Sequence, residues 1–279
     1  MRARLDFALA QTPRLYARLL RRRRHVDRDK LAFLALVRRG DVVLDVGANT
    51  GYYTLLFSHL VGRQGRVHAF EPVPPTFAVL AARLEREGVF ANVVPNELAL
   101  AAEDGPLPVF VPGSDHGQAS ITPHHAGSWL LAEAERRYDC RAATIDGYLR
   151  ARRLGPPAFI KCDVEGAELR VLEGAVETLR ARPPLLHLEV NPDWSRDLGY
   201  APPDLVRFLA GFGYSLFFLV GESVRRLAEP ARELACFRGS ANLICGVPAL
   251  HGARLRRLPP LLREAGRGTA AGGKPAGAG

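Results

Sequence analysis

The sequence predicts an α/β protein in which helices cover both faces of a mostly parallel sheet. Short apolar segments alternate with longer amphipathic ones, the pattern of strands joined by helices. Four of the apolar segments end in acids, at Asp45, Glu71, Asp163 and Glu189. Parallel strands place their carboxyl ends at one edge of a sheet, and ligands bind beyond that edge. We therefore expect these acids to converge on one site.

Composition excludes some classes of protein. The 279 residues are 47% hydrophobic, enough for one globular domain with extensions. The formal net charge of +9 suggests a nucleic-acid partner, but the basic residues concentrate near the ends, at 21–24 and 254–267. We therefore expect no nucleic-acid partner. The four cysteines lack C-x-x-C spacing, which favours reduced thiols over a disulfide framework or a zinc site.

Three segments are expected along the chain. Residues 1–39 form a basic, helical N-terminal extension, 40–250 the main domain, and 251–279 a basic and then Gly/Ala-rich disordered tail. Within the domain, 112–138 has little periodicity and is interpreted as a substrate loop. No apolar run reaches membrane-spanning length, and no secretory segment is recognisable, so we expect a cytoplasmic protein without a membrane span.

The first strand, near 42–46, leads into the loop D-V-G-A-N-T-G at 45–51 and then a helix. Gly47 and Gly51 lack the Cβ atoms that would block a ligand from approaching the backbone. The loop fails the dinucleotide fingerprint G-x-G-x-x-G, because Asn49 stands at the middle glycine. Asp45 would repel a pyrophosphate but suits a ligand with a cationic amine, such as S-adenosylmethionine.

The next two strands supply further candidate contacts. Glu71 ends the second strand 24 positions after Gly47, where an acid can accept hydrogen bonds from both ribose hydroxyls of a nucleotide-like cofactor. Nicotinamide cofactors and S-adenosylmethionine both carry that ribose. Asn96 follows the third strand, at 92–95, where such folds contact an adenine ring. A role as an ordinary turn residue is an equal alternative for Asn96.

After 96 the alternation breaks. Two short apolar segments, 98–100 and 107–111, flank a Glu-Asp-Gly turn and predict a β-hairpin. The following insertion contains His116, His124 and His125, whose spacing fits no standard metal site. We interpret them as surface histidines and predict no metal site; Mg²⁺ is left open without a supporting motif.

The remaining pattern returns to strands and helices. Asp29 is expected to cap a helix over 29–37. A charged excursion is expected at 222–237. The other expected elements are helices at 144–153, 168–179 and 203–211 and strands at 158–162, 185–190, 214–220 and 241–247.

Three motifs together carry a family resemblance. D-V-G-A-N-T-G at 45–51, F-E-P at 70–72 and K-C-D-V-E-G-A-E at 161–168 resemble the FkbM-type family of S-adenosylmethionine-dependent methyltransferases. The resemblance covers about 40–247 and departs at Cys162, where the family usually has a β-branched residue. It implies a Rossmann-like class I fold, with seven strands of which the last is antiparallel. It also implies O-methylation of a hydroxyl on a small-molecule, natural-product or glycan acceptor.

The resemblance also implies roles for individual residues. The methionine end of the cofactor, its ribose and its adenine would be held by Asp45, Gly47, Asn49, Gly51, Glu71 and Asn96. Asp163 would face the methyl group, where it could position the acceptor hydroxyl, take its proton or bind Mg²⁺. Glu165 and Glu189 are its expected partners in catalysis, and His116, His124 and His125 of the insertion are alternative bases. For Glu165, capping of the following helix is the structural alternative.

Two other functions fit part of the sequence. An NAD(P)-dependent oxidoreductase would explain the loop and Glu71, but not the missing middle glycine or the acids at 163–168. A binding module without catalysis would leave the strand-end acids unexplained, since clustered carboxylates repel each other. No motif names the acceptor or the oligomeric state.

Overall fold

The computed structural model describes residues 12, 15–16, 27–89, 91–113, 119–123, 135–220 and 223–258. Most of the expected N-terminal extension, most of the expected substrate loop and the chain after 258 lie outside these ranges. The insertion histidines His116, His124 and His125 lie outside them as well.

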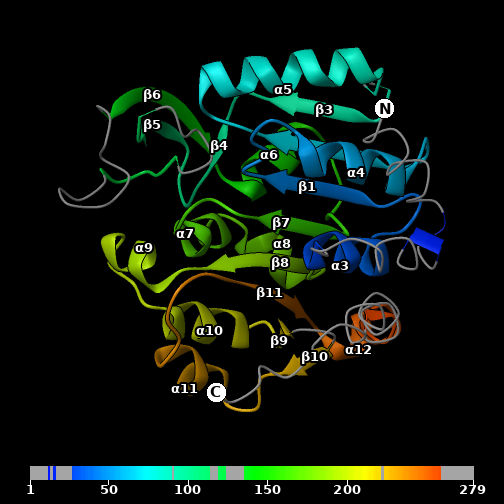
Figure 1. Ribbon diagram of the computed structural model, residues 1–279, viewed down its shortest axis with the longest axis vertical. Helices are drawn as coiled ribbons and strands as arrows, with labels where there is room; N and C mark the ends of the chain where they lie inside the picture. The colour runs from blue at the N-terminus through cyan, green and yellow to red at the C-terminus, as the bar shows by residue number, and fades with distance from the viewer. Residues whose placement is uncertain are drawn as a thin grey trace, which may run out of the picture.

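Within the described ranges, eight strands form one sheet in the order β10-β9-β11-β8-β7-β1-β2-β3 (Figure 1). The pairs from β3 through β8 are parallel, whereas β11 runs antiparallel to both of its neighbours. This confirms the predicted mostly parallel sheet with an antiparallel last strand, to which β10 adds an edge strand. The strands are β1 (Val42–Val46), β2 (Arg66–Phe70), β3 (Val93–Asn96), β7 (Phe159–Cys162), β8 (Leu185–Val190), β9 (Ser215–Val220), β10 (Ser223–Arg226) and β11 (Ala241–Gly246).

Helices cover both faces of this sheet. The faces differ by the alternation of side chains along each strand: Val43 joins one buried cluster and Leu44 the other. Phe33, fully buried in the first cluster, contributes roughly 1.5–3 kcal/mol by its burial. On the first face lie α3 (Arg28–Leu36), α4 (Tyr52–Val61), α5 (Pro74–Glu87) and α12 (Pro248–Leu255); on the second lie α6 (Ile145–Ala151), α7 (Glu168–Glu173), α8 (Val176–Ala181) and α10 (Pro202–Ala210).

The predicted helix over 168–179 is two short helices, α7 and α8, separated at Gly174. A Cβ atom at Gly174 would lie 2.1 Å from the carbonyl oxygen of Ala101. Only glycine therefore allows the backbone at 174 to pack this closely against the backbone at Ala101. The helix α6 matches its prediction, with the Thr144 hydroxyl accepting a hydrogen bond from the Gly147 N–H at 3.0 Å.

The predicted hairpin between 98–100 and 107–111 is wrong. The strands β4 (Ala99–Leu100) and β5 (Gly105–Val111) do not pair with each other; both pair with β6 (Arg136–Ala143), which lies between them in a second sheet. The β5–β6 ladder is antiparallel over seven residue pairs, against two for β4. Pairing with the longer β6 therefore prevails over the local turn. This small sheet lies beyond the carboxyl ends of the central strands (Figure 1).

The start of α3 also differs from the prediction. Asp27, not Asp29, caps the helix by accepting a hydrogen bond from the Lys30 N–H at 2.9 Å. Asp29 instead joins α3 to the sheet, since its carboxylate contacts His187 on β8 and Asn242 on β11, each at 2.9 Å. The helix is thus part of the domain core.

Two further segments differ from a simple strand and helix pattern. The expected charged excursion contains β10 and α11 (Pro230–Ala235). The first residues of the expected tail are helical, since α12 continues to Leu255. They also contact the domain, because Arg254 donates two hydrogen bonds to the Asp41 carboxylate, at 2.6 and 2.8 Å.

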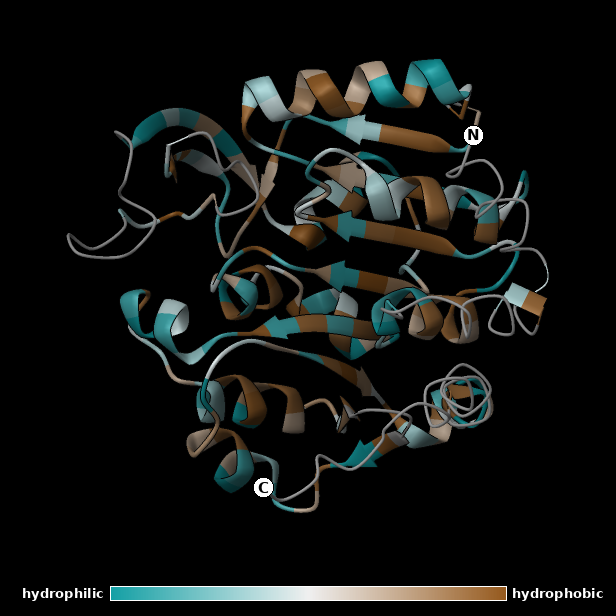
Figure 2. Ribbon diagram, viewed as in Figure 1, coloured by the Kyte–Doolittle hydropathy of each residue, from teal (hydrophilic) through white to brown (hydrophobic). Residues whose placement is uncertain are grey.

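Hydropathy follows the fold. The central strands are largely hydrophobic, with hydrophilic positions towards the carboxyl ends of β1, β7 and β8 (Figure 2). No helix in the described ranges has both the length and the apolar character needed to cross a membrane. The four cysteines are free: three are buried, and Cys236 is exposed.

Candidate active site

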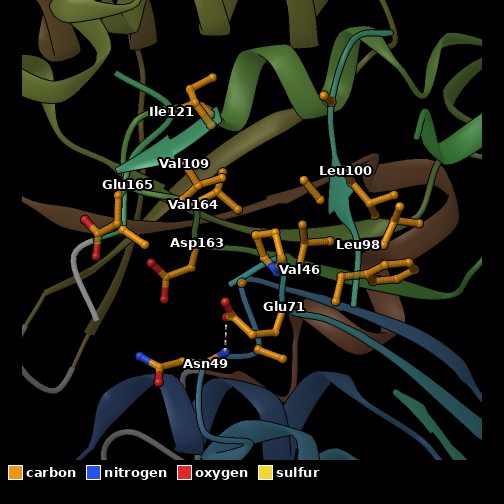
Figure 3. Close-up of a pocket in the computed structure, with 18 of the residues that line it drawn as sticks. Val46, Asn49, Glu71, Leu98, Leu100, Val109, Ile121, Asp163, Val164 and Glu165 are labelled. Carbon is orange, nitrogen blue, oxygen red and sulfur yellow. Dashed lines mark hydrogen bonds between the residues drawn. The ribbon is translucent and has the colours of Figure 1, made fainter. Parts of the chain in front are cut away.

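A cavity of about 280 Å³ opens at the carboxyl edge of the central sheet, between that sheet and β5 (Figure 3). Its polar side is formed by the loop after β1, by Glu71 after β2 and by the segment after β7. Its apolar side is formed by residues of the second sheet and its surroundings, among them Leu98, Leu100, Val109 and Ile121. The cavity thus lies where the strand-end acids predicted a ligand.

The glycine loop fits closely against the segment that follows β7. Gly47 has a φ of +72°, and a Cβ atom there would lie 1.9 Å from the carbonyl oxygen of Asp163. The loop is tied to β2, because the N–H groups of Gly47 and Ala48 both donate to the carbonyl of Phe70, at 3.1 and 2.9 Å. Gly51, also left-handed with a φ of +82°, is the N-cap of α4. The backbone of the loop is therefore fixed before any ligand arrives.

Glu71 is held at the cavity wall by backbone groups. Its carboxylate accepts hydrogen bonds from the N–H of Asn49 and the N–H of Val73, both at 3.0 Å. Each carboxylate oxygen can accept a second hydrogen bond, so capacity remains for two ligand hydroxyls. Burial is the main reason that the pKa of Glu71 is raised, to about 7, and the two backbone hydrogen bonds partly oppose it.

Asp45 has a different position from the one its place in the loop suggested. Its side chain is fully buried and does not line the cavity. One oxygen accepts a 2.6 Å hydrogen bond from the Thr54 hydroxyl of α4, and the other lies 3.6 Å from the Lys161 ammonium. Asp45 shares with Val43 the face of β1 that packs against α3 and α4, so its carboxylate lies behind the glycine loop and supports it.

Three carboxylates lie close together at the side of the glycine loop away from Glu71, after β7 and at the end of β8. Oxygens of Asp163, Glu165 and Glu189 all lie within 4.8 Å of one another. Asp163 and Glu165 line the cavity, while Glu189 accepts a hydrogen bond from the Ser240 hydroxyl. Carboxylates this close repel each other unless a proton or a cation lies among them.

The three acids do not ionise alike. Burial would raise the pKa of Asp163, but the adjacent Lys161 ammonium lowers it below its usual range. Burial and the neighbouring carboxylates raise the pKa of Glu165 to about 10 and that of Glu189 to about 7. At neutral pH Asp163 is therefore ionised and Glu165 is protonated, while Glu189 binds and releases a proton readily.

Asn96 is fully engaged within the protein. Its amide nitrogen donates to the carbonyls of Ala69 and Val94, at 3.1 and 2.9 Å, and its amide oxygen accepts from the Tyr148 hydroxyl at 3.0 Å. Asn96 is not among the cavity-lining residues; Leu98, two positions later, is. The apolar side chains after β3 thus face the space expected for an adenine.

Tyr52 and Tyr53 line the cavity and were not among the predicted site residues. The Tyr53 hydroxyl contacts both oxygens of Asp27, at 3.4 and 3.3 Å, and Lys30 donates to the Tyr52 hydroxyl at 3.2 Å. Two aromatic residues directly after a glycine loop were the available signal. Their polar partners come from α3, which local sequence does not place beside them.

Comparison with known proteins gives one match to a domain family. The profile of the methyltransferase FkbM domain matches residues 45–216. The chain is 29% identical over 222 residues to the 31-O-demethyl-FK506 methyltransferase FkbM of Streptomyces tacrolimicus, covering 72% of this chain and 82% of that protein. It is 28% identical over 141 residues to the hexuronic acid methyltransferase AglP of Haloferax volcanii, covering 50% and 52% of the two chains.

A solved structure is also similar. The methyltransferase FkbM from Methylobacillus flagellatus KT superposes with a TM-score of 0.47 and 17% sequence identity. The alignment covers 82% of this chain and 58% of that one.

Proposed function

Because the chain belongs to the FkbM family of S-adenosylmethionine-dependent methyltransferases, we propose that it methylates a hydroxyl oxygen of a small-molecule, natural-product or glycan acceptor. The observation that carries the proposal is the placement of Glu71 and Asp163 on either side of the glycine loop, both facing one cavity (Figure 3). The names of two relatives support an oxygen-rich acceptor, one specifying a 31-O position and the other a hexuronic acid.

The cavity fits a cofactor with a cationic end and a flat, apolar end. The backbone of Gly47, Asn49 and Gly51 would hold the methionine portion, with Asp45 supporting the loop from behind. The carboxylate of Glu71 would accept hydrogen bonds from the two ribose hydroxyls. Leu98 would contact the adenine ring, and Asn96 would fix the strand end from which Leu98 extends.

When bound, the cofactor supplies a methyl group activated by a cationic sulfur. The remaining requirements are placement of the acceptor oxygen and removal of its proton. Asp163, ionised beside Lys161, would orient the hydroxyl and receive its proton as the new oxygen–carbon bond forms. Glu189, whose pKa is raised to about 7, would then accept that proton from Asp163, whereas Glu165, whose pKa is raised to about 10, would already be protonated and would donate a hydrogen bond within the group.

The test is methyl transfer from isotopically labelled S-adenosylmethionine to panels of uronic acids, polyhydroxylated natural products and, for comparison, amines. Mass spectrometry of the products locates the methyl group. We expect an O-methyl product that requires Asp163. A product methylated at nitrogen or carbon would contradict the proposed acceptor atom, without affecting the family assignment.

A further inference from the structure

Lys161 lies on β7 at the carboxyl edge of the sheet, beside the residues of the proposed site. Its side chain is only 3% exposed, although its ammonium reaches the cavity wall. An ammonium removed from water is costly unless charged and polar partners surround it. The identity of those partners therefore indicates what the residue does.

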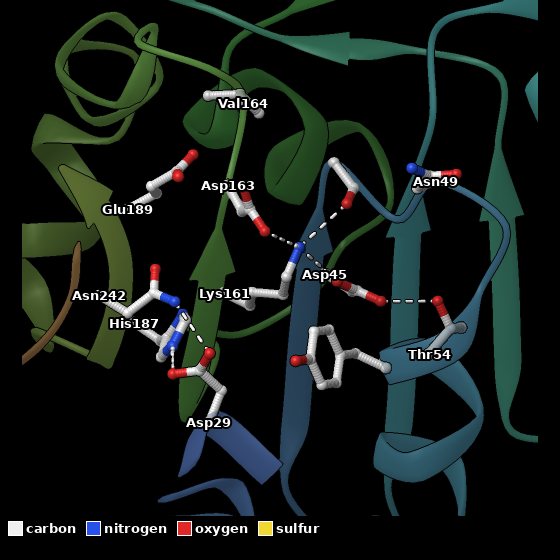
Figure 4. A network of polar contacts seen from close by, with 12 residues as sticks. Asp29, Asp45, Asn49, Thr54, Lys161, Asp163, Val164, His187, Glu189 and Asn242 are labelled. Carbon is white, nitrogen blue, oxygen red and sulfur yellow. Dashed lines mark hydrogen bonds and ion pairs between the residues drawn. The ribbon is translucent and has the colours of Figure 1, made fainter. Parts of the chain in front are cut away.

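The ammonium contacts three different parts of the site (Figure 4). It donates a hydrogen bond to the carbonyl of Gly47 at 3.0 Å, and it forms ion pairs with Asp163 at 3.3 Å and with Asp45 at 3.6 Å. The Gly47 carbonyl thus accepts a hydrogen bond, while the two carboxylates balance the charge of the ammonium from either side. Burial alone would lower the pKa of Lys161, but the two carboxylates raise it, and the group stays cationic.

The remaining side is covered by an aromatic ring. The centroid of the Tyr53 ring lies 5.8 Å from the ammonium, within the range of a cation–π interaction. The Tyr53 hydroxyl is in turn bonded to Asp27, the cap of α3. The ring thus keeps water from the ion pairs, which strengthens them.

We propose that Lys161 is a positioning residue, which holds the glycine loop and the methyl-facing Asp163 at a fixed separation. The inference rests on the proposed function, since it takes the loop as the cofactor site and Asp163 as the acid at the methyl group. Without the ammonium, the carbonyl of Gly47 and two carboxylates would face each other with no cation between them. The loop and the acid would then move apart, and both cofactor binding and transfer would suffer.

Lys161→Ala tests this, because it leaves a space that a small amine can enter from the cavity. The measurement is S-adenosylhomocysteine affinity by calorimetry, with and without added ethylammonium, and with ethanol as the neutral analogue. We expect affinity to fall by about tenfold or more, as for loss of a hydrogen-bonded buried charge. Ethylammonium should restore most of it, and ethanol should not.

Cys162→Ala is the matched control. Cys162 is the next residue of the same strand, fully buried but on the opposite face, so its truncation creates a cavity without touching the ion pairs. We expect unchanged S-adenosylhomocysteine affinity and no response to ethylammonium. If Lys161→Ala does not fold, Lys161→Met provides the comparison, because it fills the space without a charge and should also bind weakly.

The inference is overturned if Lys161→Ala or Lys161→Met binds S-adenosylhomocysteine as the wild type does, or if ethylammonium fails to restore binding to Lys161→Ala. The proposed function fails separately: a wild-type protein that binds S-adenosylhomocysteine but methylates no hydroxyl would contradict O-methylation, while the amine response would still support Lys161 as the residue that holds the loop.

Discussion

The two sides of the cavity are built in different ways. The floor, made of the glycine loop, Glu71 and Asp163, consists of polar groups fixed by hydrogen bonds and by strand register in the central sheet. The cover, made of Val109, Ile121 and their neighbours in the second sheet, is apolar and is held by packing on a small cluster around Val73. Figure 3 shows Val109 and Ile121 together, away from Asn49 and Glu71.

The floor therefore provides the polar groups that bind and react, whereas the cover determines the shape of the cavity. A hydrogen bond or an ion pair contributes little free energy once one partner is removed or displaced, so floor substitutions should have large effects on binding and turnover. Apolar contact depends on area and tolerates small changes, so cover substitutions should have small ones. The predictions below test that separation, beginning with the largest expected effect.

Asp163→Asn should reduce turnover by about 10²–10⁴-fold, the usual contribution of a positioned general base. The amide keeps the shape of the side chain but cannot take the acceptor proton. S-adenosylhomocysteine affinity should stay within about threefold of wild type, less than 1 kcal/mol. Rates with a hydroxyl acceptor and calorimetry give the two numbers, and Asp139→Asn, an exposed acid on β6, is the control. Full activity in Asp163→Asn would remove Asp163 from the mechanism.

Glu71→Ala should weaken S-adenosylhomocysteine binding by about 100-fold, because two hydrogen bonds to a charged acceptor are lost. The N–H groups of Asn49 and Val73 also lose their partner. Calorimetry measures the effect against Glu97→Ala, which removes an exposed acid near the same edge that does not line the cavity. Equal loss in both variants would show that general electrostatics, and not the ribose contact, is responsible.

Binding should also depend on pH through Glu71. Its pKa is raised to about 7, so the carboxyl is ionised above that pH and protonated below it. Protonation removes an acceptor for the ribose hydroxyls, and affinity should fall by up to about tenfold for each unit below pH 7. In Glu71→Gln this pH dependence should disappear. A dependence that persists unchanged in Glu71→Gln would assign the titration to another group.

Val109→Ala on the cover should weaken S-adenosylhomocysteine binding by only a few fold, because Val109 is already buried without a ligand and a bound cofactor would cover little more of its surface. The same change should lower the free energy of unfolding by about 2 kcal/mol, because Val109 is buried in the cluster that anchors the second sheet. Thermal melting and calorimetry separate the two effects, with Val79→Ala, exposed on α5, as the control. A loss of affinity as large as in Glu71→Ala would contradict the expectation that cover substitutions affect binding less than floor substitutions.

The floor could be predicted largely from the sequence, and the cover could not. Apolar strands ending in acids are a local pattern, and the parallel sheet then brings Glu71 and Asp163 to one cavity and Glu189 close to Asp163. The buried orientation of Asp45 follows from strand alternation, because Asp45 and Val43 are two residues apart and share the face of β1 that packs against α3 and α4. The cover depends on β6, which joins β5 across a segment without periodicity.

Long-range pairing also limits prediction around α3. Asp29 contacts His187 and Asn242 across 158 and 213 positions of sequence, and no local rule connects such residues. The predicted cap at Asp29 rests on residue type, and Asp27, two positions earlier, is also an aspartate at the start of the same apolar segment. Tertiary contacts decided between them.

The most direct test of a methyl-transfer cofactor site is calorimetry of the wild-type protein with S-adenosylhomocysteine and, separately, with NADH. The loop lacks the middle glycine that a pyrophosphate requires, and Asp45 lies directly behind it, so one molecule of S-adenosylhomocysteine should bind and NADH should not. Binding of NADH without binding of S-adenosylhomocysteine would contradict the assignment of this cavity.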